Sequence, residues 1–174
     1  AGVTPRARKE TPEGIELQFA TNVLGYFWMI KEFTDVLKDS APSRIVNVAS
    51  YWAGDLNIDD LEFKRRNYSN NTAYRQSKQA DRMMSAAFAE RLEPLGITVN
   101  ACHPGDVNSN LSNNLGFGGH ESAEEGASTP VMLATTPAGS ENTGKYFEHG
   151  RESRDRFTHD RAAVERLFAR LEEY

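Results

Sequence analysis

Tyr74 and Lys78 stand four positions apart in a stretch whose apolar pattern predicts a helix. That spacing places the two side chains on one helical face, one turn apart. A phenol ordinarily keeps its proton up to a pH of about 10, so it is a poor acid or base at neutral pH. An ammonium about 4–6 Å away stabilises the phenolate and allows the phenol to relay a proton under physiological conditions. The pair alone also fits an ordinary surface contact, so its context has to decide.

Polar residues follow two predicted strands at the point where each strand ends. Residues 44–49 (RIVNVA) predict a buried strand followed by Ser50, and residues 97–102 (ITVNAC) predict a second that runs into a turn at Pro104. Ligands of open α/β sheets bind at the carboxyl ends of the strands. A hydroxyl in that place donates a hydrogen bond to a developing oxyanion. We therefore expect Ser50 to face the same site as Tyr74.

The remaining elements must position these residues. Short β-rich runs between long helices predict βαβ crossovers and a mainly parallel sheet with helices on both faces. A sheet of three strands is small for a free-standing domain, so we expect an N-terminal portion to be missing. Loops are expected at residues 50–71, 103–119 and 151–156. Helices are expected at residues 13–38, 72–91, 122–135 and 160–173, and strands at 44–49, 97–102 and 144–148.

Composition excludes several classes of protein. The 174 residues favour one domain, and 39% hydrophobic and 26% charged residues are typical of a soluble globular chain. A net charge of −5 argues against binding to nucleic acid or an anionic membrane, and the longest apolar run, residues 26–30, is too short to span a bilayer. Cys102 is the only cysteine, which favours a reducing compartment, and we expect a cytoplasmic protein. The four histidines have no metal-ligand spacing, so each is expected to be structural or on the surface, and no metal site is expected.

Taken together, five segments resemble the short-chain dehydrogenase/reductase family over nearly the whole chain. They are AGV at residues 1–3, TNVLG at 21–25, RIVNVAS at 44–50, the Tyr74-x-x-x-Lys78 motif, and PGDVNS at 104–109. The resemblance implies a Rossmann-like, doubly wound parallel α/β sheet. Residues 1–174 would form the C-terminal portion of a single Rossmann-fold oxidoreductase domain, without its first three and a half βα units.

The resemblance also implies a catalytic set of four residues in an NAD(P)-dependent oxidoreductase that interconverts a carbonyl and an alcohol. Tyr74 would give its proton to the carbonyl oxygen of an aldehyde or ketone, and Ser50 would hydrogen-bond the same oxygen. Lys78 would favour the phenolate and hold the nicotinamide ribose. Asn22, an amide within an apolar helix, would anchor a water behind Lys78.

The cofactor implied is NAD(P)(H), with NADP(H) favoured slightly. Val107 would meet the carboxamide through its backbone, and Ser109 stands where the family usually has threonine. The small-molecule substrate would touch Ser50, Tyr51, Trp52 and Tyr74, and the two longest helices would pack against a second subunit in a homodimer. Cofactor contacts are implied for Ala1, Gly2, Asn22, Tyr74, Lys78, Pro104, Gly105, Val107 and Ser109.

Two features refine this interpretation. The long interval between Ser50 and Tyr74 and the pattern of residues 160–167 are similar to the branch that contains retinol dehydrogenases and WW-domain oxidoreductases. The family's Thr-Gly-x-x-x-Gly-x-Gly loop is absent, and residues 116–119 do not replace it because Glu121 stands where a glycine is needed. These residues alone are therefore expected to bind a dinucleotide poorly, and a catalytically inactive binding or scaffold protein of the same fold is the alternative. A serine hydrolase is not favoured, because Ser50 lies in no G-x-S-x-G motif.

Overall fold

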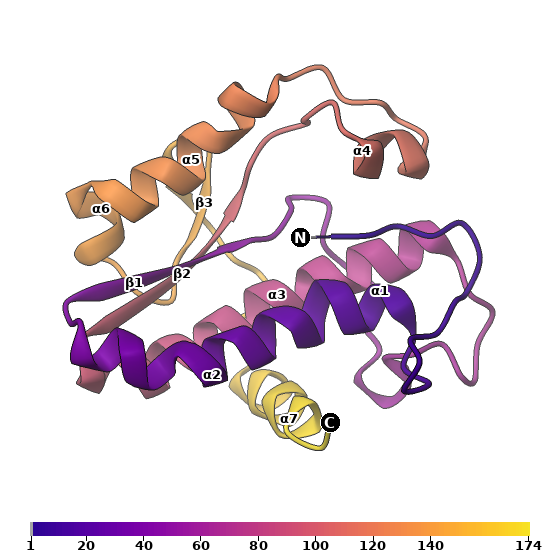
Figure 1. Cartoon of the computed structure of the whole chain (residues 1–174), viewed down its shortest axis with the longest axis horizontal. Coiled ribbons are helices and arrows are strands. Elements are labelled where there is room, and N and C mark those ends of the chain that lie inside the picture. The colour runs from indigo at the N-terminus through magenta and orange to yellow at the C-terminus, as the bar shows by residue number, and fades with distance from the viewer. Residues whose placement is uncertain (1) are drawn as a thin grey trace.

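The computed structural model describes residues 2–174, which form a four-stranded sheet between two layers of helices (Figure 1). The strand order is β1-β2-β3-β4, in which β1, β2 and β3 run parallel and β4 is antiparallel to β3. This confirms the α/β class with a mainly parallel sheet. The strands are β1 (Ser43–Val48), β2 (Ile97–His103), β3 (Tyr146–Glu148) and β4 (Arg151–Ser153).

Helices cover both faces of the sheet, as Figure 1 shows: α5 and α6 lie on one face, α2 and α3 lie on the other, and α7 packs on the far side of α3. The long helices are α2 (Gly25–Asp39), α3 (Asn70–Leu92), α5 (Ala123–Thr135) and α7 (Arg161–Leu171). The short ones are α1 (Leu17–Phe19), η1 (Ala20–Leu24), η2 (Ile58–Asp60), η3 (Glu93–Leu95), α4 (Asn110–Leu115) and α6 (Pro137–Ser140).

The main core lies where α2, α3 and α7 meet. Phe27, Phe88 and Phe168 come one from each helix, and their ring centroids are 5.0–5.3 Å apart. All three are buried. The two contacts of Phe168 are edge-on, and aromatic pairs of this kind stabilise a core beyond the area that they bury. They pack α3, which carries Tyr74 and Lys78, against α2 and α7.

The two helices expected to pair with a second subunit differ in exposure. α7 packs along α3 and buries the side of α3 that faces away from the sheet. α2 keeps an apolar side open to solvent, made of Trp28, Met29, Phe33 and Val36. Of the surface that α2 and α3 were expected to offer to a second subunit, the side on α2 is therefore the part left exposed.

The expected loop at residues 151–156 is wrong in part, because it contains β4. His149 and Gly150 join β3 to β4 and have positive φ angles of 47° and 73°. Two such residues form the turn that best matches the twist of a hairpin. The charged side chains of β4 are typical of an edge strand, and because the strand lacks apolar alternation its sequence does not predict it.

Two further boundaries differ from expectation. The helix expected from residue 13 begins at Leu17, where the Glu16 carboxylate accepts the Gln18 and Phe19 N–H groups, and it passes through the wide π-turn η1 before α2. The expected loop at 103–119 contains α4, capped by Ser109 and ended by Gly116 at a φ of 94°.

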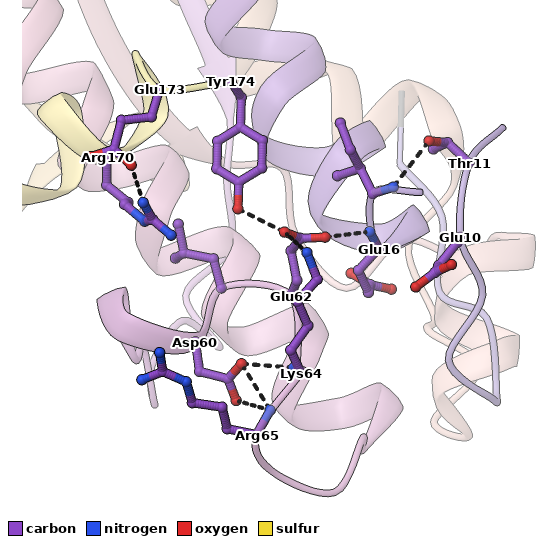
Figure 2. Close-up of polar contacts among 12 residues, drawn as sticks. Glu10, Thr11, Glu16, Asp60, Glu62, Lys64, Arg65, Arg170, Glu173 and Tyr174 are labelled. Atoms are coloured by element: carbon purple, nitrogen blue, oxygen red, sulfur yellow. Dashed lines mark hydrogen bonds and ion pairs between the residues drawn. The ribbon is translucent and has the colours of Figure 1, made fainter. Parts of the chain in front are cut away.

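A polar network ties the C-terminus to the start of the first helix (Figure 2). The Glu62 carboxylate accepts hydrogen bonds from the Tyr174 hydroxyl at 2.8 Å, the Lys64 ammonium at 2.7 Å and the Glu16 main-chain N–H at 3.1 Å. Burial alone raises the pKa of Glu62, but these hydrogen bonds outweigh it and hold the pKa below its usual value. The long segment between β1 and α3 is thereby fixed by contacts remote in sequence.

Candidate active site

A cavity of ≈ 580 Å³ opens at the carboxyl ends of β1 and β2. This volume lies within the range of small-molecule sites. The cavity gathers most of the residues singled out from the sequence, from four separate segments of the chain. Those that line it are Gly2, Ser50, Tyr51, Trp52, Tyr74, Lys78, Pro104, Gly105, Val107 and Ser109.

Tyr74 and Lys78 both reach this cavity from α3. Their exposed fractions are 7% and 4%, so both side chains are largely withdrawn from water. The Lys78 ammonium donates to the Val48 carbonyl at 2.9 Å and to the Asp81 carboxylate at 2.8 Å. Burial alone would lower the pKa of Lys78, but the Asp81 carboxylate holds it above its usual range. The site therefore contains a protonated amine beside a shielded phenol.

Ser50 is placed by the end of β1 and by two contacts to its surroundings. Its hydroxyl accepts the Trp52 N–H at 3.1 Å, and its carbonyl accepts a hydrogen bond from Arg82 on α3 at 3.4 Å. Its exposed fraction is 4%. An oxygen that accepts from a main-chain N–H keeps its own O–H free to donate into the cavity.

Asn22 lies behind the cavity rather than in its wall. Its side chain exchanges two hydrogen bonds with the main chain of Val3, at 2.8 and 3.0 Å, and lies 3.4 Å from the Ser77 hydroxyl. The structure thus gives Asn22 a structural task, which is to hold residues 2–4 against η1. Its expected part in a water relay behind Lys78 stays a prediction.

The turn after β2 is shaped by two close approaches to Val107. A Cβ atom on Gly126 of α5 would lie 2.3 Å from Val107 Cγ2, and one on Gly119 would lie 2.4 Å from the Val107 carbonyl oxygen. Only glycine fits in either place. Ser109, two residues after Val107, caps α4 by accepting the Ser112 N–H at 3.2 Å, so its hydroxyl already has a partner within the protein.

Aromatic side chains and a histidine complete the wall. Phe117 packs edge-on against Trp52 at 5.7 Å, and Tyr51 packs edge-on against His103 at 4.6 Å. Burial lowers the pKa of His103, which favours its neutral form. The expectation of a structural or surface role for each histidine missed that His103 and His120 line the cavity. The signal for His103 was its position at the end of β2, which meets the end of β1.

Ala1, expected at the cofactor, lies outside the described residues. Within residues 2–174 no cluster of three or more His, Cys, Asp or Glu side chains is arranged to hold a metal ion. No helix in that range is both long and apolar enough to cross a membrane.

Comparison with known proteins agrees with this geometry. The short chain dehydrogenase family matches residues 1–117. Human retinol dehydrogenase 14 is 36% identical over 162 residues, and human retinol dehydrogenase 13 is 35% identical over 165 residues. These alignments cover 84% and 85% of this chain but 48% and 50% of the relatives, so the chain spans about half the length of the curated relatives it matches.

Solved structures share the fold. A protein from Mycobacterium paratuberculosis of uncharacterized function superposes with a TM-score of 0.78 at 26% identity, over 99% of this chain and 63% of that one. NADPH-bound carbonyl reductase from chicken fatty liver gives 0.59 at 21% identity, over 88% and 62%. A Leptospira borgpetersenii short chain dehydrogenase with bound NAD+ gives 0.61 at 20% identity, over 85% and 60%. The chain belongs to the short-chain dehydrogenase/reductase family, in the branch of the retinol dehydrogenases.

Proposed function

We propose that residues 1–174 form the C-terminal portion of one Rossmann-fold domain of an NAD(P)-dependent oxidoreductase that interconverts a carbonyl and an alcohol. The observation that carries this proposal is that Ser50, Tyr74 and Lys78 face one cavity at the carboxyl ends of β1 and β2. The names of the relatives and structural neighbours, which include dehydrogenases and a carbonyl reductase, support the same class of reaction.

The residues present fit the nicotinamide end of such a cofactor. The Gly105 and Val107 backbone and the Lys78 ammonium line a cavity in which glycines keep the Val107 backbone closely packed. The sequence has no glycine-rich phosphate loop, so the chain by itself supplies no cradle for the diphosphate. Neighbours with bound NADPH and with bound NAD+ support a nicotinamide cofactor, and NADP(H) remains our preference through the branch resemblance.

When bound, the cofactor gives or takes the hydride. The phenol of Tyr74 gives its proton to the carbonyl oxygen as the alcohol forms, and takes it back in oxidation. The Ser50 hydroxyl donates a hydrogen bond to the same oxygen, where negative charge develops. The Lys78 ammonium stabilises the phenolate that Tyr74 becomes. Tyr51, Trp52 and Phe117 line the cavity beside the reacting groups and offer apolar surface to the rest of the substrate.

Turnover of the full-length protein, which is the parent protein in all tests with cofactor below, is measured with a panel of aldehydes and ketones. Nicotinamide absorbance follows the reaction and tests the proposal. Tyr74→Phe keeps the ring packing and should lower the rate by about 100- to 10,000-fold, the usual contribution of a positioned acid. Ser50→Ala should cost about 100- to 1,000-fold. Equal turnover by Tyr74→Phe would contradict the assigned role. Cofactor binding without turnover in the parent protein would support the inactive binding protein instead.

The proposal also includes a homodimer and a cytoplasmic location. The exposed apolar side of α2, with Met29, Phe33 and Val36, supports the dimer because exposed apolar patches on proteins mark contact surfaces. Sedimentation of Phe33→Glu beside the parent chain tests it: the variant should sediment as a monomer. The single, buried Cys102 supports a reducing compartment.

A further inference from the structure

Asp81 is a fully buried carboxylate to which the reaction above gives no task. It lies on α3 three residues after Lys78, and its side chain is 0% exposed. Its Oδ2 accepts the hydrogen bond from Lys78 Nζ at 2.8 Å, while its Oδ1 has no hydrogen-bond partner among residues 2–174. Desolvating a carboxylate is costly, and here one ion pair must offset most of that cost. An acid in this position is therefore expected to act through its ion pair with Lys78.

The contacts of Lys78 show how its ammonium is held in place. Its ammonium has three N–H donors, and two of them are directed to Asp81 and to the Val48 carbonyl. The nitrogen also lies 5.3 Å from the centre of the Tyr26 ring. One donor remains for the cavity. The carboxylate and the carbonyl thus fix where the positive charge sits in the wall of the cavity that Tyr74 also lines.

A carboxylate at 2.8 Å also changes the field of the ammonium. A lone ammonium attracts a nearby phenolate, whereas an ammonium beside a carboxylate acts as a dipole, whose attraction is weaker. We propose that Asp81 is a positioning residue of this site, which holds the Lys78 ammonium in place and partly neutralises the charge that Tyr74 experiences. This inference rests on the proposed function, because it concerns the pH at which Tyr74 relays a proton.

Other titratable groups face this pair from each neighbouring element. They are Tyr26 on α2, Tyr74 on α3 and Cys102 on β2. Burial raises the pKa of the Cys102 thiol to about 12, and it raises the pKa of Tyr26. Both therefore stay neutral near neutral pH, and neither supplies the countercharge of Lys78. Burial also raises the pKa of Asp81, which the Lys78 ammonium opposes.

Asp81→Asn tests the inference with little change of shape. The amide oxygen still accepts a hydrogen bond from Lys78, but the negative charge is gone. The rate of alcohol oxidation should reach half its maximum about one pH unit lower than in the parent protein, because the unopposed ammonium favours the phenolate. Glu90→Gln is the matched control, since Glu90 is an exposed carboxylate nine residues further along α3. It should leave the pH profile unchanged.

An alkaline shift in Asp81→Asn, or a profile equal to that of Glu90→Gln, would overturn the inference. A second readout needs no turnover. The infrared band of the Asp81 carboxyl, identified by its loss in Asp81→Asn, should titrate at a higher pH in Lys78→Met than in the parent chain. An unchanged titration would refute the pairing even in an active enzyme. A shifted titration in a protein without turnover would refute the proposed function and retain the Lys78–Asp81 pair.

Discussion

Arg82 and Asp155 join helix α3 to the segment after β4 through two hydrogen bonds, Nε to Oδ2 at 3.2 Å and Nη2 to Oδ1 at 3.0 Å. The same guanidinium lies over the ring of Tyr146, with Cζ 3.5 Å from the ring centre, and donates to the Ser50 carbonyl. The segment after β4 is therefore linked, through Arg82, to the main chain of Ser50, a candidate catalytic residue.

Removing one partner of this pair should be costly. Asp155→Asn leaves the Arg82 charge buried without its counter-ion, and we expect a loss of about 3 kcal/mol in the free energy of unfolding. Urea denaturation measures it. Glu152→Gln on β4 is the control, because its ion pair with Lys145 is half-exposed and should contribute less than about 1 kcal/mol. Equal losses in the two variants would show that the Arg82–Asp155 pair is no stronger than a surface contact.

The Glu62 network should make the free energy of unfolding depend on pH. The folded pKa of Glu62 lies below its unfolded value, so its contribution is present above the ordinary glutamate value of 4.5 and is lost as pH falls through the folded pKa. The difference in unfolding free energy between the parent and Glu62→Gln should be largest at neutral pH. This difference should shrink steadily as the pH falls below the ordinary glutamate pKa of 4.5. A difference that stays constant with pH would contradict the assignment.

Phe168 should anchor α7 on α3. Phe168→Ala removes a ring that packs against Phe27 and Phe88, and such truncations cost about 3–5 kcal/mol. Thermal unfolding followed by circular dichroism measures the loss. Val131→Ala on α5 provides a control, because that side chain is exposed. If Phe168→Ala unfolds with the parent, α7 is not part of the cooperative core.

Gly126 should matter because of the space that it leaves for Val107. Gly126→Ala would place a Cβ atom 2.3 Å from Val107 Cγ2, so α5 or the turn after β2 has to move. Overpacking of this size costs about 1–3 kcal/mol, and the displaced turn should weaken nicotinamide binding. Fluorescence titration with the reduced cofactor measures the second effect. The exposed neighbour Ser128→Ala should leave both quantities unchanged.

The spacing of residues in the sequence predicts much of the candidate site. The four-residue interval between Tyr74 and Lys78, and the position of Ser50 directly behind a β-rich run, were enough to predict that the three share a site. Both rest on regular geometry, because a helix returns to the same face after one turn and parallel strands end at one edge. The mainly parallel sheet and the long α3 helix follow from the same periodicities.

Contacts between distant segments could not be predicted in this way. Nothing in the spacing of Asp81 shows that the only described hydrogen-bond partner of its carboxylate is Lys78, since an acid on a helix is usually solvated. The same holds for Asn22, whose partner Val3 lies on a segment with no regular structure. β4 was missed because its charged residues pair along the backbone, which hydrophobic alternation does not report.

The pH dependence of alcohol oxidation in the parent protein and in Lys78→Met, each saturated with nicotinamide cofactor, tests the central claim most directly. If the amine prepares the phenol, the parent rate should rise to half its maximum at a lower pH than the rate of Lys78→Met, because the ammonium favours the phenolate. In Lys78→Met the rate should be lower and its midpoint should move towards alkaline pH. An unchanged midpoint and rate in Lys78→Met would contradict the account.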